Sequence, residues 1–281
     1  MQVERYCLKR TESVDLYGKL RTPDGAVKAL VIMVHGIGEH SGCYDCLGEK
    51  FARQSVGFLT FDLRGHGSSR GIRGHASLRS IGNDLRAIIQ NMREKFPDIP
   101  IVLLGHSMGG QIVLNCALDS DVGVQGVIAS SPWLKLVRPP SSWLLCLARR
   151  AVHIVPWLTV STGIRADQLS PDGAGIKSTK TDPMLHKKIS VKLFSDLWKS
   201  GDMLLRNKHQ INIPLLLMHG TADPLCSCQA SRSFAQNAGE YAVFRQWDGM
   251  YHNLLNAADS EEVFQYVMKW LSNQVIENGT F

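Results

Sequence analysis

The sequence predicts an α/β fold in which a mostly parallel sheet is covered by helices on both faces. Three observations lead to this prediction. Short apolar strands alternate with amphipathic helices along most of the chain. A Gly-x-Ser-x-Gly turn at 105–109 joins one of these strands directly to a helix. Residues 131–210 break the alternation over a stretch too long for a plain loop, so we expect a small helical cap inserted over the sheet.

The expected strands are short apolar runs bounded by turn residues. The first two are joined by a turn at 10–12 and start the fold as an antiparallel pair, and Pro23-Asp24-Gly25 forms the next turn. Several later runs are almost wholly apolar, which is typical of strands buried on both faces. In chain order, we expect strands at 3–9, 13–20, 29–34, 57–61, 101–104, 124–129, 214–220 and 241–247.

The expected helices carry apolar side chains on one face. The segment 78–96 keeps its apolar residues at helical spacing, and Pro97 and Pro100 end it before the next strand. In chain order, we expect helices at 43–54, 78–96, 111–118, 229–238 and 261–275. With 281 residues, the chain is long enough for one domain, 1–281, with 131–210 as an inserted cap subdomain.

The composition is that of an ordinary globular protein, with 44% hydrophobic and 20% charged residues. The first ten residues have no apolar core of the kind found in a signal peptide. The seven cysteines have no metal-ligand spacing, and His-Glu-x-x-His is absent from the sequence. We therefore expect free thiols, a cytoplasmic protein, no bound metal and no cofactor.

The positive charge is concentrated in the expected cap. Residues 131–210 contain 13 Lys or Arg against 5 Asp or Glu, whereas the rest of the chain has 18 against 20. Four of the six tryptophans lie in the same segment, and it has no signature of a nucleic-acid-binding fold. This combination favours peripheral contact with an anionic lipid surface over binding to nucleic acid. A merely solvated basic face is the alternative.

Ser107 lies at the centre of the Gly-x-Ser-x-Gly turn. A buried strand precedes it and an apolar helix follows, a context that holds a serine hydroxyl above the end of a sheet. The helix beginning after Ser107 directs free backbone N–H groups toward that hydroxyl. Ser107 is therefore our candidate nucleophile; the alternative is a serine that only caps the helix.

A serine nucleophile needs a base, and the base needs an orienting acid, in the chain order Ser, Asp or Glu, His. Asp223 and His252 fit this order because each follows an expected strand at the sheet edge that carries Ser107. Asp248 lies close to His252 but outside the expected position. His219, at a strand end, is interpreted as a packed core residue. Asp62 precedes the serine, and we interpret its loop, 62–69, as scaffolding.

Together these residues resemble the monoacylglycerol lipase and lysophospholipase group of α/β-hydrolases, from about Leu16 to the last helix. The motifs that carry the resemblance are His35-Gly-Ile-Gly-Glu-His40, Asp62-Leu-Arg-Gly-His-Gly-Ser68, Gly105-His-Ser-Met-Gly-Gly110, Gly220-Thr-Ala-Asp223 with Leu225-Cys226, and Tyr251-His252. The resemblance implies the α/β-hydrolase fold and a triad of Ser107, Asp223 and His252. It also implies an oxyanion hole formed by the backbone N–H groups of Ile37 and Met108. Ala257 departs from the pattern, since many relatives have an acid there.

The resemblance implies a serine ester hydrolase that cleaves monoacylglycerols to a fatty acid and glycerol through an acyl-enzyme. We expect the apolar residues of the cap to line an acyl channel and to touch the membrane that holds the lipid substrate. The candidates are Trp133, Trp143, Leu144, Trp157 and Leu158. The alternative is that these residues simply pack the cap against the core.

Other functions stay open at this point. A lysophospholipase, thioesterase, peptidase or other carboxylesterase would use the same triad, because all of them pass through a tetrahedral acyl intermediate. A non-catalytic ligand-binding protein on the same fold is disfavoured by the intact set of Ser107, Asp223 and His252. Acyl-chain length, head-group preference and oligomeric state leave no signal in the sequence.

Overall fold

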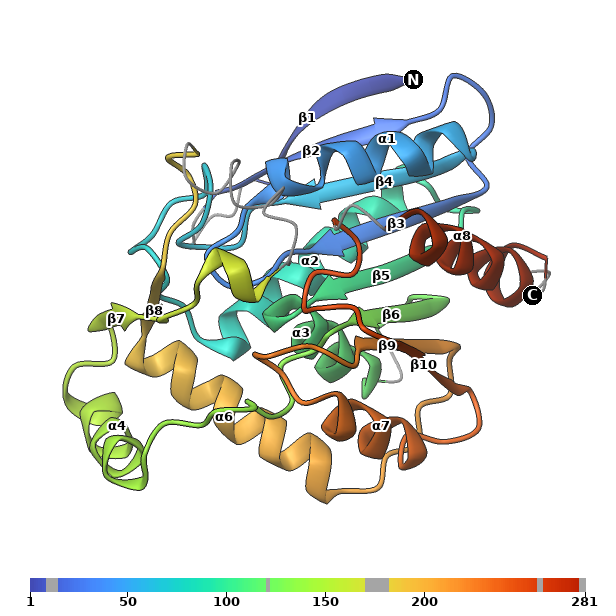
Figure 1. Ribbon diagram of the computed structural model, residues 1–281. Coiled ribbons are helices and arrows are strands. Elements are labelled where there is room, and N and C mark those ends of the chain that lie inside the picture. Colours follow the sequence, from blue (N-terminus) through green and yellow to red (C-terminus); the bar gives the residue numbers. More distant parts are fainter. Residues whose placement is uncertain (9–14, 120–121, 170–181, 257–259, 278–281) are drawn as a thin grey trace.

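A computed structural model describes residues 1–8, 15–119, 122–169, 182–256 and 260–277. Its central sheet has eight strands in the order β1-β2-β4-β3-β5-β6-β9-β10 (Figure 1). The strands of this sheet are β1 (Gln2–Leu8), β2 (Leu16–Thr22), β3 (Ala29–Val34), β4 (Val56–Phe61), β5 (Ile101–His106), β6 (Gly126–Ser130), β9 (Leu215–Gly220) and β10 (Ala242–Trp247).

The sheet is parallel from β4 to β10 and antiparallel at β1 and β2. Parallel neighbours need crossover connections, and helices supply them in this chain. The register pairs Val34 with Gly105 and His106 with Ser130, so the carboxyl ends of β3, β5 and β6 meet at one edge. This edge is where open α/β sheets build their ligand sites.

Helices cover both faces of the sheet. In β3, Leu30, Ile32 and Val34 belong to the apolar core beneath α2, α3, α6 and α7, and the alternate residues belong to the core beneath α1 and α8. A strand buried on both faces reads as a continuous apolar run, which is the pattern in the sequence. The helices are α1 (Asp45–Arg53), α2 (Leu78–Lys95), α3 (Met108–Ala117), α4 (Ser142–Ile154), α6 (Val191–Arg206), α7 (Cys228–Gln236) and α8 (Ser260–Leu271).

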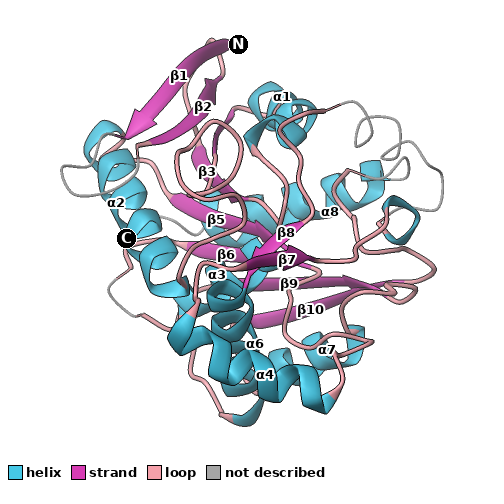
Figure 2. Cartoon of the chain, turned by 90° about the vertical axis from the view of Figure 1, so that its left-hand side faces the viewer, coloured by secondary structure: helices cyan, strands magenta, loops and turns pink. Residues whose placement is uncertain are grey.

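The described part of 131–210 contains strands as well as helices. β7 (Thr159–Ser161) and β8 (Lys188–Ser190) pair in an antiparallel two-stranded sheet. The expected helical segment therefore also holds a short β-ladder in its described residues. Strands of three residues are too short to show an alternating pattern, and their partners are far apart in the sequence. Figure 2 views the molecule from the side on which β7, β8 and α4 lie.

Most boundaries differ from the predicted ones by a few residues. The helix after Ser107 begins at Met108 rather than 111, and the expected helix 43–54 divides into a 3₁₀ turn, Ser41–Tyr44, and α1. The last helix ends in a π-helical turn, Ser272–Ile276. The predicted turn at 10–12 and the departure at Ala257 lie outside the described residues. Across the described ranges, no helix combines the length and apolarity needed to cross a membrane.

Candidate active site

Ser107 lies between β5 and α3 with φ 55° and ψ −114°. A positive φ is strained for a serine, and residues with such strain are common at active sites. The turn is also too tight for side chains beside the serine. A Cβ on Gly105 would lie 2.3 Å from the carbonyl oxygen of Gly109, and a Cβ on Gly109 would lie 2.0 Å from that of Val34. The two glycines therefore allow the sharp turn that presents Ser107.

The structure brings Asp223 and His252 together. Asp223 follows β9, His252 follows β10, and the Nδ1 atom of His252 lies 2.6 Å from Oδ2 of Asp223. The side chains are 1% and 3% exposed, so the pair is shielded from water. With its proton on Nδ1, His252 leaves Nε2 as the atom that can accept a proton.

Two backbone N–H groups hold the other carboxylate oxygen of Asp223. Its Oδ1 accepts from Leu225 N at 2.8 Å and from Cys226 N at 3.0 Å. Burial opposes ionisation of this carboxyl, but His252 and His219 outweigh burial and hold its pKa well below the usual range. Asp223 is therefore a carboxylate throughout the neutral pH range.

The ring of His252 contacts the serine turn at His106. Its imidazole lies against that of His106, the residue before Ser107, with ring centroids 4.9 Å apart. Burial lowers the pKa of His106 to about 4, so this ring stays neutral beside His252. Within the described residues, no hydrogen bond joins Ser107 directly to His252. Such bonds are often long before substrate binds.

The loop after β3 faces the same turn. The N–H groups of Ile37 and Met108 donate no hydrogen bond within the described residues, and Gly109 packs directly on the end of β3. Glu39 closes this loop, since its Oε2 accepts from Gly36 N at 2.8 Å and from the Tyr44 hydroxyl at 2.7 Å. Two unused N–H groups beside a serine are what an oxyanion hole requires.

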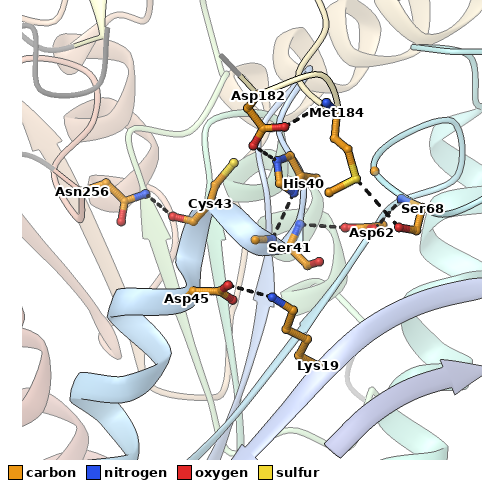
Figure 3. A network of polar contacts seen from close by, with 12 residues as sticks. Lys19, His40, Ser41, Cys43, Asp45, Asp62, Ser68, Asp182, Met184 and Asn256 are labelled. Atoms are coloured by element: carbon orange, nitrogen blue, oxygen red, sulfur yellow. Dashed lines mark hydrogen bonds and ion pairs between the residues drawn. The ribbon is translucent and has the colours of Figure 1, made fainter. Parts of the chain in front are cut away.

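Asp62 has a scaffolding role, as interpreted from the sequence. Its Oδ1 accepts from Ser41 N and its Oδ2 from Ser68 N, both at 2.7 Å, and these bonds join two neighbouring loops (Figure 3). A Cβ on Gly67 would lie 2.2 Å from this carboxylate. Asp62 therefore shapes the loops beside the serine turn.

A segment from the second half of the chain, 182–186, contacts both loops. Asp182 Oδ2 lies 2.8 Å from Nε2 of His40, and Met184 approaches Ser68 (Figure 3). The N–H of His186 donates to the carbonyl oxygen of Gly38 at 3.0 Å. Because Nδ1 of His40 accepts from Gly42 N, Nε2 carries the proton donated to Asp182. Residues 182–186 are thus bonded to the loop that contains Ile37.

The cap candidates divide into two groups. Trp133 is 8% exposed, belongs to the main core, and donates its backbone N–H to the carbonyl oxygen of Ser107. The other four candidates, Trp143, Leu144, Trp157 and Leu158, lie in or just after α4 and are all exposed. No residue of α4 is fully buried, whereas Trp133 packs in the main core as the alternative expects.

Sequence reasoning missed a partner of Asp223. His219 is fully buried, as expected for a packed residue, but its Nε2 also lies 2.9 Å from Oδ2 of Asp223. The spacing of four residues around a strand end is the only signal in the sequence. Asp248, the rival acid, instead accepts from the Gln246 side chain.

One cavity of the molecule lies away from this cluster. A cavity of about 490 Å³ lies between α2, α3 and α6 and is not lined by Ser107, Asp223 or His252. Among the side chains that the structure describes, no group of three His, Cys, Asp or Glu could hold a metal ion.

Comparison with known proteins decides the family. The family described as "Serine aminopeptidase, S33" matches residues 25–259 of this chain. The chain belongs to the S33 family. A crystal structure of the monoacylglycerol lipase of Paleococcus ferrophilus is similar to it, with a TM-score of 0.84 and 29% identity over 92% of this chain and 99% of that chain. The α/β-hydrolase fold predicted from the sequence is thereby confirmed.

Several relatives of this S33-family chain carry lipase names. It is 28% identical to the monoacylglycerol lipase of Mycolicibacterium smegmatis, over 89% of this chain and 90% of that protein. It is also 28% identical to the phospholipase YtpA of Bacillus subtilis, over 84% of this chain and 92% of that protein. An uncharacterized abhydrolase domain-containing protein of Dictyostelium discoideum is 33% identical, and the chain spans 28% of its length. These matches confirm the resemblance to the monoacylglycerol lipase group, and the chain is a hydrolase of the lipase and esterase type.

Proposed function

We propose that the chain is a serine hydrolase that cleaves the carboxylic ester of monoacylglycerols, with Ser107 as nucleophile. The contact between His252 Nδ1 and Asp223 Oδ2 carries this proposal, because it orients an imidazole beside a strained serine turn. An aspartate that fixes the tautomer of a histidine is the arrangement that activates a serine hydroxyl.

The reaction then runs in two steps. His252 Nε2 takes the Ser107 proton while the serine oxygen bonds to the ester carbonyl carbon, and Asp223 stabilises the imidazolium that forms. The imidazolium returns that proton to the departing alkoxide, which releases glycerol and leaves an acyl-enzyme. Water attacks the acyl-enzyme by the same route, releases the fatty acid and restores the Ser107 hydroxyl.

The proposed oxyanion hole consists of the N–H groups of Ile37 and Met108. Each carbonyl addition places negative charge on the former carbonyl oxygen, and a fixed N–H donor stabilises that charge by about 3–4 kcal/mol in comparable sites. The support for this role is that both N–H groups are unused within the described residues and that Gly109 holds the two segments in contact.

The proposed substrate class follows from the relatives and the cap. The relatives include monoacylglycerol lipases of similar length. We propose that 131–210 acts as a cap, in which Trp133 borders the acyl chain near Ser107 and the exposed group on and after α4 contacts the membrane. Exposed tryptophan and leucine beside Arg149 and Arg150 match the chemistry of an anionic lipid interface. The cysteines are free, which fits a cytoplasmic protein at that surface.

A lysophospholipase is the second candidate. Its support is the positive excess of 131–210, which would attract a phosphate head group, and the phospholipase among the relatives. The triad and the oxyanion donors would keep the same roles.

Fatty-acid release from a long-chain monoacylglycerol and from the matching lysophospholipid tests the proposal. Both should be measured side by side, with Ser107→Ala as the blank. We expect preference for the monoacylglycerol and no turnover by the variant, whose folding is checked by its melting temperature. Preference for the lysophospholipid would replace the substrate class, and turnover by Ser107→Ala would overturn the assignment of the nucleophile.

A further inference from the structure

We propose that His219 is a positioning residue that holds Asp223 in place for His252 and limits the negative charge available to His252. This inference rests on the proposed function, since it assigns a role within the same triad. It also extends the triad into a buried chain of four side chains, Ser231–His219–Asp223–His252.

Each link of this chain is a hydrogen bond between buried groups. Ser231 Oγ, on α7, lies 2.8 Å from Nδ1 of His219, and Nε2 of His219 lies 2.9 Å from Oδ2 of Asp223. His219 and Ser231 are both 0% exposed. Water therefore has no access through which it could replace either partner.

The neighbours of His219 determine which nitrogen carries its proton. Nε2 lies within hydrogen-bond distance of two acceptors, Asp223 Oδ2 and the carbonyl oxygen of Cys226 at 3.1 Å. Neither acceptor has a proton to give, because Asp223 is ionised and the other group is a carbonyl. Nε2 must therefore be the protonated atom, and the Ser231 hydroxyl donates to Nδ1. His219 is fixed as a donor toward Asp223.

This donor completes the coordination of the Asp223 carboxylate. Oδ1 is held by two backbone N–H groups, so His219 and His252 share Oδ2. A carboxylate held at both oxygens cannot rotate, which keeps Oδ2 directed at Nδ1 of His252. An outer partner of this kind fixes the orientation of a reacting group without touching substrate.

Because His219 and His252 both bond to Oδ2, His219 also affects how strongly Asp223 stabilises a proton on His252. If the His219 donor is removed, more of the negative charge on Oδ2 acts on His252, and the imidazolium form of His252 becomes more stable. A reaction that needs neutral His252 then requires a higher pH. The acid limb of the profile of kcat/KM against pH must move upward.

Other titratable groups around this pair keep their charge state. His106 lies against His252, and its pKa is lowered to about 4, mainly by burial. Glu39, behind His106, has a lowered pKa, because His106, the Tyr44 hydroxyl and a backbone N–H outweigh its burial. Burial raises the pKa of the Cys226 thiol well above its usual range. Between about pH 5 and 8 these three groups do not titrate, so they leave the acid limb unchanged.

The first test compares His219→Met with His219→Gln. Methionine fills the space without an N–H donor, whereas the glutamine amide can still donate to Asp223. We expect His219→Met to lower kcat by about 10- to 100-fold, the range measured for lost outer partners of metal-binding residues, with KM unchanged. Its acid limb should lie at higher pH, and His219→Gln should restore both kcat and the profile. Equal profiles for the wild type and His219→Met would overturn the proposal.

The second test does not depend on turnover. The hydrogen-bonded Nδ1 proton of His252 and the ¹⁵N shifts of His219 can be followed by NMR. We expect the wild-type His219 signals to show protonated Nε2, and Ser231→Ala, a milder change, to move the His252 proton signal in the same direction as His219→Met. An unmoved signal would overturn the positioning role. If the wild type cleaves no ester while the signal moves, the proposed function fails and the contact stands.

Discussion

The carboxylate of Glu39 accepts the backbone N–H of Gly36 at 2.8 Å and so closes the loop that carries Ile37. The same oxygen accepts from the Tyr44 hydroxyl, which fixes the carboxylate in turn. A partly buried acid thus determines where the Ile37 N–H lies, although it has no part in the proton transfers proposed above.

We therefore expect Glu39→Ala to lower kcat while leaving KM nearly unchanged. A shift of the donor by about 1 Å can cost on the order of 100-fold in rate. Glu39→Gln should lose less, because its amide oxygen can still accept from Gly36. Steady-state kinetics on a soluble short-chain ester measures the effect, with Gln90→Ala on the exposed face of α2 as control. An unaltered kcat for Glu39→Ala would show that the loop holds its shape without this side chain.

The His40–Asp182 bond should contribute to stability. The His40 side chain is 4% exposed, and Asp182→Ala would leave its Nε2 proton without a partner. We expect a loss of about 1–3 kcal/mol in the free energy of unfolding, the cost of a buried unsatisfied donor. Urea unfolding measures this loss in the free energy of unfolding.

The matched control is Asp202→Ala, which breaks the exposed ion pair with Arg206 and should cost under about 1 kcal/mol. Equal losses for the two variants would contradict the structural role of the contact between His40 and Asp182.

Acid should weaken the packing of three histidines, His35, His66 and His186, whose rings lie in a row. Burial lowers the pKa of all three, that of His186 to about 4. The unfolded chain therefore binds more protons than the folded chain between about pH 6.5 and 4. The free energy of unfolding must fall as the pH drops through this window.

Urea unfolding at several pH values between 7 and 4.5 measures this loss. His186→Gln should make the dependence on pH shallower, because one of the three histidines no longer titrates. His153→Gln, at an exposed position of α4, should keep the wild-type slope. The same slope in His186→Gln and the wild type would show that this histidine is not responsible.

Arg149 and Arg150 of α4 should contribute to membrane binding. A basic residue near an anionic surface is worth about 1 kcal/mol, so Arg149→Glu with Arg150→Glu should weaken binding to phosphatidylserine vesicles by at least about tenfold. Vesicle sedimentation measures it. Arg53→Glu with Lys95→Glu changes the net charge equally at α1 and α2 and should have a smaller effect. Equal weakening by both pairs would point to net charge rather than to the cap surface.

The sequence by itself determined the sheet, the helices that cover it and the three residues of the candidate triad. These follow from local patterns. Apolar runs mark the buried strands, and the turn at 105–109 requires glycines where a Cβ atom would clash with neighbouring backbone atoms. Chain order then selected Asp223 and His252, because the carboxyl ends of parallel strands meet at one edge of the sheet.

Only the tertiary structure decided the contacts between these segments. His219 reads as one more buried residue in the sequence, and its bond to Asp223 depends on how the loop after β9 turns back. Likewise, the pairing of β7 with β8 and the bond between His40 and Asp182 join residues far apart in the chain. The physical reason is that burial leaves a periodic pattern along the sequence, whereas a hydrogen bond depends on two side chains that folding alone brings within 3 Å.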